Sequence, residues 1–315
     1  MSLLRSLVLS LMLLAVADQV LAAHRVVVQG KGKLAIVKAD GDIEWEMGWG
    51  GIHDIQVLKN GHILVQQGPA KVAEIDPATK QVVWSYDSAK QNGNDGKRVE
   101  VHAFQPLEDG RLMIAESGPA RIIEIDRDGK LLKEVKLKVT HPNPHTDTRL
   151  ARKLSNGNYL VCHEGDGFVR EYDGKSSDVV WEYEVPLFGK QPKGGHGPEA
   201  FGNKCFAAVR LPSGNTLIAT GNGHSLIEVT RDKQVVWKIE QTDLPGITLA
   251  WVTTLEVLPN GNYLFGNCHA GEGQPLLIEL QPKTKEVVWK FDRFATFGND
   301  VSNSQLLDAD VATLR

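Results

Sequence analysis

The stretch HDIQVLKNGHILV, residues 53–65, decides the fold because its pattern recurs four more times along the chain. In each copy a leucine lies three positions before a glycine that follows Asn, Asp or Ser, and a short apolar run comes next. Asn-Gly and Asp-Gly tolerate positive φ angles, so we expect two-residue turns that join antiparallel strands. The turn glycines, which are 47 to 57 residues apart, are Gly61, Gly110, Gly157, Gly214 and Gly261.

Each repeat contains four short apolar segments with β-branched residues and Gly, Asn, Asp or Pro at their boundaries. Four-stranded units of this length predict the blades of a β-propeller. Five blades are complete. Residues 25–47 supply three further strands without an innermost one, and residues 302–310 supply an innermost strand with nothing after it. We therefore predict an all-β fold, a six-bladed β-propeller with four antiparallel strands per blade, in which the two chain ends share a blade and close the ring.

Tryptophan and glutamate recur at fixed positions of the repeat. A recurring tryptophan in the outermost strand predicts a core position, and a recurring glutamate one strand further in is expected to hydrogen-bond within its sheet and not to act as an acid. The tryptophans are Trp45, Trp84, Trp181, Trp237 and Trp289, and blade two has Lys133 instead. The glutamates are Glu74, Glu124, Glu171, Glu228 and Glu279.

The first 22 residues have the pattern of a secretory signal peptide. Arg5 is followed by an apolar run over 6–17 and by the small-residue cleavage pattern Val20-Leu21-Ala22. A membrane anchor is the weaker interpretation, because this run is too short to span ~30 Å of hydrocarbon. We expect residues 23–315 to form one exported domain, periplasmic or extracellular, with no membrane span after cleavage.

Composition excludes several partner classes. The formal charge of −4 and the lack of a basic run give no reason to expect nucleic acid. The odd number of cysteines, Cys162, Cys205 and Cys268, fits no metal or disulfide framework. We expect buried free thiols, with a Cys162–Cys205 bridge as the less favoured alternative, and a monomeric protein.

Blade topology sorts the turns onto two faces of the disc. Turns between the first and second strands lie on one face, and hairpins between the second and third strands share the other face with the crossovers between blades. Eight of the ten histidines fall on the second face, whereas His62 lies on the first and His24 is terminal. Innermost strands converge on the axis, so side chains from distant blades can meet there and form a binding site. A polar face without a shared site remains the alternative.

Three residues occupy one repeat offset at the start of the innermost strands, and they are the catalytic candidates: His53, His102 and Arg149. Further residues of the same face are candidates for binding: Asp54, His145, His163, His196, His224, His269, Trp251 and Asn303. Clustered imidazoles beside an arginine resist protonation, because like charges repel.

Neutral histidines permit three kinds of function. One is a histidine nucleophile, with nearby cations that stabilise the transferred group. Another is a transition-metal site, for which CHEGDG and CHAGEG place His163 and His269 near acids. The third is non-catalytic binding of a small molecule, a glycan or a protein. The sequence has no tight metal motif, and the metal and the cofactor stay open.

HDIQVLKNGHILV also resembles the repeat of the arylsulfotransferase group of propellers, in which a His-Asp pair accompanies an LPNGN turn; LPNGN itself occurs at residues 258–262. The resemblance extends over nearly the whole mature chain. It implies an exported six-bladed enzyme that transfers a sulfuryl group between phenols through a covalent sulfohistidine. His53 matches the motif, and His102 and Arg149 occupy the equivalent strand position.

The stretches EIDPATKQVVW and ELQPKTKEVVW resemble the blade-docking motif of quinoprotein-like propellers with the pyrroloquinoline-quinone-like repeat. That resemblance implies that each tryptophan packs onto the next blade. Dehydrogenases of that type use eight blades and a disulfide between adjacent cysteines, which this chain lacks, so we infer no cofactor. We therefore predict an exported, non-catalytic propeller that binds a ligand on a His/Arg-lined central face. The alternatives are group transfer and His-ligated metal chemistry.

Overall fold

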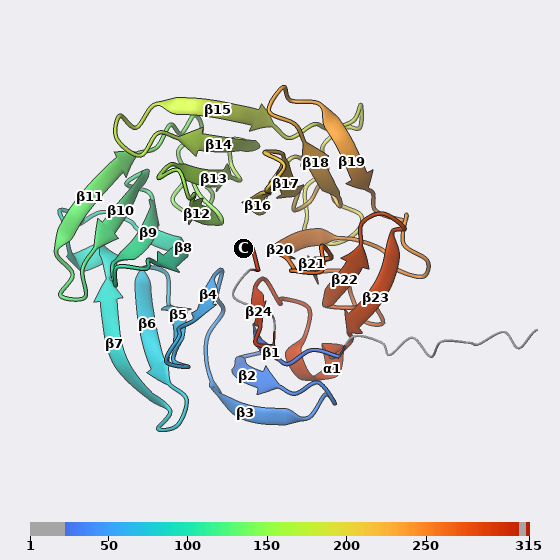
Figure 1. Ribbon diagram of the computed structural model, residues 1–315, viewed down its shortest axis with the longest axis horizontal. Coiled ribbons are helices and arrows are strands. Elements are labelled where there is room, and N and C mark those ends of the chain that lie inside the picture. The colour runs from blue at the N-terminus through green and yellow to red at the C-terminus, as the bar shows by residue number, and fades with distance from the viewer. Residues whose placement is uncertain (1–22, 309–312) are drawn as a thin grey trace, which may run out of the picture.

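The computed structural model describes residues 23–308 and 313–315, so the predicted signal peptide lies outside the described residues. Six four-stranded antiparallel sheets surround a central axis (Figure 1). The prediction of a six-bladed β-propeller is therefore confirmed. In Figure 1 the innermost strand of every blade lies next to the axis and the outermost strand lies on the rim.

The strands of each blade follow one another from the axis outward. The first blade contains β24 (Ser304–Leu306), β1 (Val26–Gly30), β2 (Lys33–Val37) and β3 (Ile43–Gly48). The second contains β4 (Ile55–Val57), β5 (Ile63–Gln67), β6 (Lys71–Asp76) and β7 (Gln81–Asp87). The third contains β8 (Glu100–Pro106), β9 (Leu112–Ser117), β10 (Arg121–Ile125) and β11 (Leu131–Lys136).

The other three blades repeat this order. The fourth contains β12 (Ala151–Lys153), β13 (Tyr159–His163), β14 (Phe168–Tyr172) and β15 (Val179–Glu184). The fifth contains β16 (Ala207–Arg210), β17 (Thr216–Ala219), β18 (Leu226–Val229) and β19 (Val235–Ile239). The sixth contains β20 (Trp251–Val257), β21 (Tyr263–Cys268), β22 (Leu277–Gln281) and β23 (Glu286–Phe291). The helical pieces in the described residues are the 3₁₀ turn η1 (Ser88–Lys90) and the helix α1 (Phe294–Phe297).

The two chain ends share the first blade, as predicted. Strand β24 pairs with β1 through Val26 opposite Leu306 and Val28 opposite Ser304. The observed strand is shorter than the predicted segment 302–310, of which 309–310 lie outside the described residues. This pairing gives the first blade its innermost strand and closes the ring.

The repeated turns differ from the expected two-residue type. The amide of Gly61 donates to the carbonyl of Leu58, and the amide of Leu58 donates to the carbonyl of His62. The loop between this last pair therefore has three residues, 59–61. Gly61 has φ of 85°, while Asn60 does not have a positive φ. This is a type I turn followed by a left-handed glycine, which also explains why a serine, Ser213, is tolerated before the glycine in one copy.

The recurring tryptophans hold neighbouring blades together, as the quinoprotein resemblance implies. The indole nitrogen of Trp45 donates to the carbonyl of Pro77 at 2.8 Å, in the outer turn of the next blade. Trp84, Trp181 and Trp237 donate in the same way to the following blades. Trp289 instead packs edge-on against the ring of His24, 5.0 Å between centroids.

The recurring glutamates bond within their sheets, as predicted, and four of them also bind the next blade through charged or imidazole groups. Glu171 accepts a hydrogen bond from Asn158 of its own blade at 2.8 Å, and it pairs with Arg210 at 2.7 Å and with Arg231 of the following blade. Glu74 likewise has a partner within its own blade, because its carboxylate lies 2.7 Å from Nδ1 of His62. These glutamates are structural residues.

The three cysteines are free and buried, which confirms the expectation of free thiols. Among the residues that the structure describes, no helix is long and apolar enough to cross a membrane.

Loss of the closing strand should destabilise the whole ring. Leu306 is 3% exposed and belongs to an apolar cluster with Val26 and Val28. Leu306→Ala should lower the free energy of unfolding by about 2–5 kcal/mol, and deletion of residues 302–315 should lower it further. Val236→Ala, at an outer-strand side chain that is 55% exposed, is the matched control. Unchanged urea unfolding of the deletion variant would show that the pairing does not hold the ring.

Acid should weaken the contacts between blades. Burial alone would raise the pKa of Glu171, but the hydrogen bonds from Asn158 and Arg231 and the charges of Arg210 and Arg231 outweigh it and hold the pKa below its usual range. A lowered pKa in the folded state contributes stability above about pH 4.3, the usual pKa of glutamate, and this stability is lost as the pH falls through the lowered value.

Glu171→Gln should therefore reduce the free energy of unfolding at pH 7 by about 1.5–3 kcal/mol and make it decline less between pH 5 and pH 3. The control is Glu286→Gln on the exposed side of β23. Parallel pH profiles for the wild type and Glu171→Gln would contradict this account.

Candidate functional site

Polar side chains from several blades meet at the end of the channel where the crossovers between blades lie. Two adjoining cavities, of about 500 Å³ and about 220 Å³, share His53, Cys268, His269 and Ser302 in their walls. The larger one also includes Glu100. The smaller one includes further residues from the fourth, fifth and sixth blades: His145, Arg149, Glu164, His196, Lys204, Phe206, Trp251 and Thr253.

Three histidines from separate segments form the first cluster. The ring centroids of His53 and His102 are 4.6 Å apart, and that of His145 is 6.1 Å and 5.6 Å from them. His53 lies just before β4, His145 lies in the crossover before β12, and His102 lies in β8. The register of β8 with β9 shifts between Val101 and Ala103, so His102 is the extra residue of a β-bulge. Bulges redirect side chains in this way next to functional sites.

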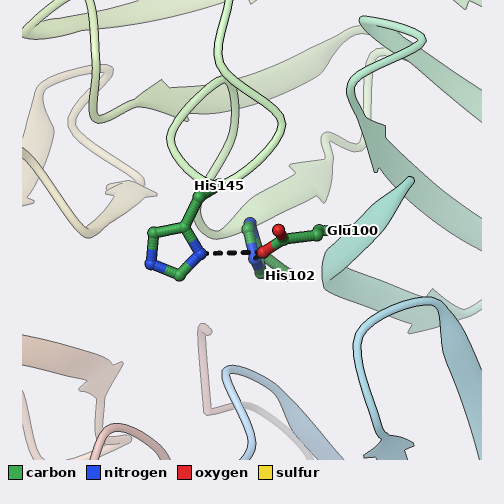
Figure 2. Close-up of side chains that lie close together, drawn as sticks. All are labelled: Glu100, His102 and His145. Carbon is green, nitrogen blue, oxygen red and sulfur yellow. Dashed lines mark hydrogen bonds and ion pairs between the residues drawn. The ribbon is translucent and has the colours of Figure 1, made fainter. Parts of the chain in front are cut away.

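Glu100 joins two of these histidines, as Figure 2 shows. Its Oε2 lies 2.8 Å from His145 Nδ1 and 3.2 Å from His102 Nε2, and its Oε1 accepts from Arg98 at 2.7 Å. The hydrogen bond to His102 and those to His145 and Arg98 hold the pKa of Glu100 far below its usual range, against the effect of burial. The sequence analysis missed Glu100, although its place two residues before His102 at the start of an innermost strand could have indicated it.

The imidazoles of His53 and His102 are neutral at pH 7. Burial lowers the pKa of His53 well below 6.5, and the charges of His102, Arg149 and His145 lower it further. Burial likewise lowers the pKa of His102 to about 4, although its hydrogen bond to Glu100 acts in the opposite direction.

His53 is fixed through its backbone and not through its ring. Its amide donates to Gln66 Oε1 at 2.7 Å, and its carbonyl accepts from Asn303 Nδ2 at 2.9 Å. Its Nδ1 atom is buried and has no hydrogen-bond partner. Asn303 therefore positions His53, and the ring of His53 keeps one buried nitrogen without a hydrogen-bond partner.

A buried cation lies behind the cluster. Arg149 is 4% exposed; its Nε pairs with Glu164 and its Nη1 donates to the carbonyl of His145. Glu164 also faces Lys204 at 3.6 Å. Glu164 was considered only as an acid beside His163 in CHEGDG, and Lys204 was not among the predicted site residues.

Three aromatic side chains form the other side of the smaller cavity. The rings of His196 and Trp251 stack at 4.9 Å with an angle of 29°, and His269 lies 5.1 Å from His196. His269 Nδ1 is 3.1 Å from Asp300. Burial lowers the pKa of His269 despite the opposing charge of Asp300.

Four expected binding residues, and the catalytic candidate His102, do not line either cavity. Asn303 instead binds the carbonyl of His53. Asp54 is buried in a two-point ion pair with Arg152, with distances of 2.7 and 2.9 Å. His163 contacts the carbonyl of Asp147 and the hydroxyl of Tyr172. His224 lies between the carbonyls of Ala250 and Ala200. Their place on the correct face does not bring them into the channel, because each side chain instead satisfies buried polar groups of the fold.

The opposite end of the channel has a cavity of about 750 Å³ lined by residues of the repeated turns. Its arginines already have carboxylate partners, since Arg210 and Arg231 share Glu171 and Arg152 pairs with Asp54. The histidine end is therefore the candidate functional site. The three free cysteines of the described residues are far apart in the sequence. They cannot form the disulfide between consecutive cysteines that covers the quinone in the dehydrogenases, so the cavity does not fit a quinone bound in that way.

Comparison with known proteins supports the fold. A crystal structure of a protein of unknown function from Bacteroides caccae has a TM-score of 0.73 and 22% identity, over 91% of this chain and 100% of that chain. A catalytically inactive histidine-to-alanine variant of virginiamycin B lyase from Staphylococcus aureus with Quinupristin has a TM-score of 0.52 and 14% identity, over 87% and 85%. At these identities the likeness shows the fold alone. No curated protein sequence matches the chain.

A family model matches residues 30–291, which span most of the propeller. Its repeat is the quinoprotein-like one that the sequence indicated. This protein therefore belongs to the family described as outer membrane protein assembly factor BamB.

Proposed function

We propose that this protein is an exported, non-catalytic propeller that binds a small molecule in the cavities at the histidine end of its channel. The observation that carries the proposal is that His53, whose buried Nδ1 atom has no hydrogen-bond partner, lines both cavities. A buried polar atom without a partner costs about 1–3 kcal/mol. A ligand that supplies a hydrogen bond to this atom recovers that free energy.

The walls indicate the chemistry of the ligand. Trp251 and Phe206 offer apolar ring surfaces, and Lys204 and Arg149 place positive charge near the same cavity. Neutral imidazoles add groups that can donate or accept hydrogen bonds. This combination suits a planar or ring-shaped molecule with an anionic or polar substituent. If the ligand is instead a macromolecule, the family description favours a protein that binds on the same face.

Group transfer is the second candidate function. His53 matches the arylsulfotransferase-like motif, and its imidazole is neutral at pH 7 with the charge of Arg149 close to it. A neutral imidazole with a cation nearby is what a histidine nucleophile needs to attack a sulfuryl ester.

One set of variants separates binding from turnover. 4-Nitrophenyl sulfate should quench the tryptophan fluorescence of the wild type, and His53→Ala and Trp251→Phe should weaken its binding about tenfold, since one lost hydrogen bond or ring contact is worth about 1.4 kcal/mol. His62→Ala, on the opposite face, should bind normally.

Release of 4-nitrophenol in the presence of phenol, lost in His53→Ala, would establish group transfer and overturn the non-catalytic proposal. If a panel of aryl sulfates, phenols and monosaccharides gives no binding that depends on His53 or Trp251, the cavities are not a small-molecule site.

We also propose that the protein acts in the periplasm. The signal-like sequence of residues 1–22 and the family description support this location. N-terminal sequencing of protein from the periplasmic fraction should begin at Ala23. Recovery of the chain in the cytoplasm with Met1 intact would contradict export.

A further inference from the structure

We propose that Glu100, His102 and His145 bind a divalent transition-metal ion of the zinc class at the edge of the cavities (Figure 2). The ligand atoms are Glu100 Oε2, His102 Nε2 and His145 Nδ1. This inference deepens the proposed function and rests on it, because the ion would lie where the proposed ligand binds.

The spacing of the three groups fits such an ion. Their ligand atoms all lie within 4.8 Å of one another, and Glu100 Oε2 is 3.2 Å and 2.8 Å from the two nitrogens. Zinc binds nitrogen and oxygen at about 2.0–2.2 Å, so ligand atoms around a tetrahedral ion are roughly 3.3 Å apart. The two distances from Glu100 Oε2 are already close to this value, and the half-exposed side chain of His145 can move to bring its nitrogen nearer to that of His102.

The hydrogen bonds of His102 decide which of its nitrogens is available. Nδ1 lies 2.8 Å from the carbonyl of Thr148, which can only accept, so Nδ1 can carry the single proton of a metal-bound ring. Without the ion, Nε2 hydrogen-bonds to the Glu100 carboxylate at 3.2 Å. With the ion bound, Nε2 would offer its lone pair to the metal and Nδ1 would donate to Thr148. A metal-bound histidine that donates its other N–H to a backbone carbonyl is the usual arrangement at protein metal sites.

Two arginines lie close to the proposed ligands. Arg98 binds the other oxygen of Glu100, Oε1, and its side chain is 69% exposed, so solvent screens its charge. Arg149 Nη1 is 3.4 Å from His102 Nε2, and the ion pair of Arg149 with Glu164 offsets part of its positive charge. The carboxylate oxygen Oε2 is thus left to the metal site.

The donor set selects the metal and leaves an open position. Two imidazole nitrogens and one carboxylate suit zinc and neighbouring transition metals, whereas Mg²⁺ and Ca²⁺ prefer oxygen ligands. Three protein ligands leave a coordination position for a ligand from the cavity, as at zinc sites that act on small molecules. His53, whose ring lies 4.6 Å from that of His102, would contact the group bound there.

The test uses the untagged mature protein, stripped with a chelator and titrated with Zn²⁺ by calorimetry. We expect one tight equivalent of Zn²⁺, a higher Tm with Zn²⁺ than with Mg²⁺, and a visible d–d spectrum of a tetrahedral or five-coordinate site with Co²⁺. Glu100→Gln and His145→Ala should each weaken Zn²⁺ binding at least about tenfold, because even loss of a residue behind the ligands costs about 10- to 100-fold.

His141→Ala is the matched control, since His141 lies in the same crossover as His145, is 72% exposed, and pairs with Asp166 instead. Unchanged Zn²⁺ affinity in Glu100→Gln and His145→Ala, an equal loss in His141→Ala, or absence of a stoichiometric site overturns the proposal. Repeating the ligand assay on chelated protein separates the two proposals. If the protein binds no Zn²⁺ but ligand binding still depends on Trp251, only the metal proposal is overturned. If Zn²⁺ binds but no ligand binding depends on Trp251, only the small-molecule proposal is overturned.

Discussion

Closure of the ring by three residues of β24 is the constraint on which the rest of the structure depends. A propeller sheet without its innermost strand would expose an edge at the axis and leave the neighbouring blades without a partner surface. The same segment also reaches the site. Asn303 and Ser302, just before β24, donate to the carbonyls of His53 and Ile52, so the closing strand fixes the backbone on which the central histidine is mounted.

The two ends of the channel divide structural and functional roles. At the end formed by the repeated turns, each strand-three glutamate satisfies its own blade and most also bind the next one, and the arginines of the cavity there have carboxylate partners. At the other end the Nδ1 atom of His53 has no hydrogen-bond partner, and Glu100, His102 and His145 lie close enough together to hold a metal ion. Polar groups that the fold does not need are the ones available for a ligand.

The fold could be predicted from the sequence because every blade repeats the same physical solution. Gly61 and its four counterparts, the outer tryptophans and the glutamates each mark one place in the repeat, and the orphan strands at the two ends add up to one blade. The turn type was wrong, because Asn-Gly suits both two-residue and three-residue loops and only the hydrogen bonds of Leu58 distinguish them.

The site was less predictable, because repeat position gives the face of the disc but not the direction of a side chain. His53, His102 and Arg149 share one offset and do lie together, whereas Asp54, His163 and His224 turn into the fold to satisfy buried partners. Glu100, Glu164 and Lys204 occur in single blades, so no periodic signal could identify them. The β-bulge that places His102 next to Glu100 is likewise a local feature of one strand.

The position of β24 near the end of the chain has a consequence for biosynthesis. Domains begin to fold from their N-terminal parts while the chain is still being made. Strands β1 to β23 can pair with sequence neighbours as they emerge, but the first blade must wait with an open inner edge until residues 304–306 arrive. Since the same segment holds His53, a chain without it would have an open ring and lack an ordered site. Assembly of the cavity therefore depends on the strand that is the last of the propeller to be made.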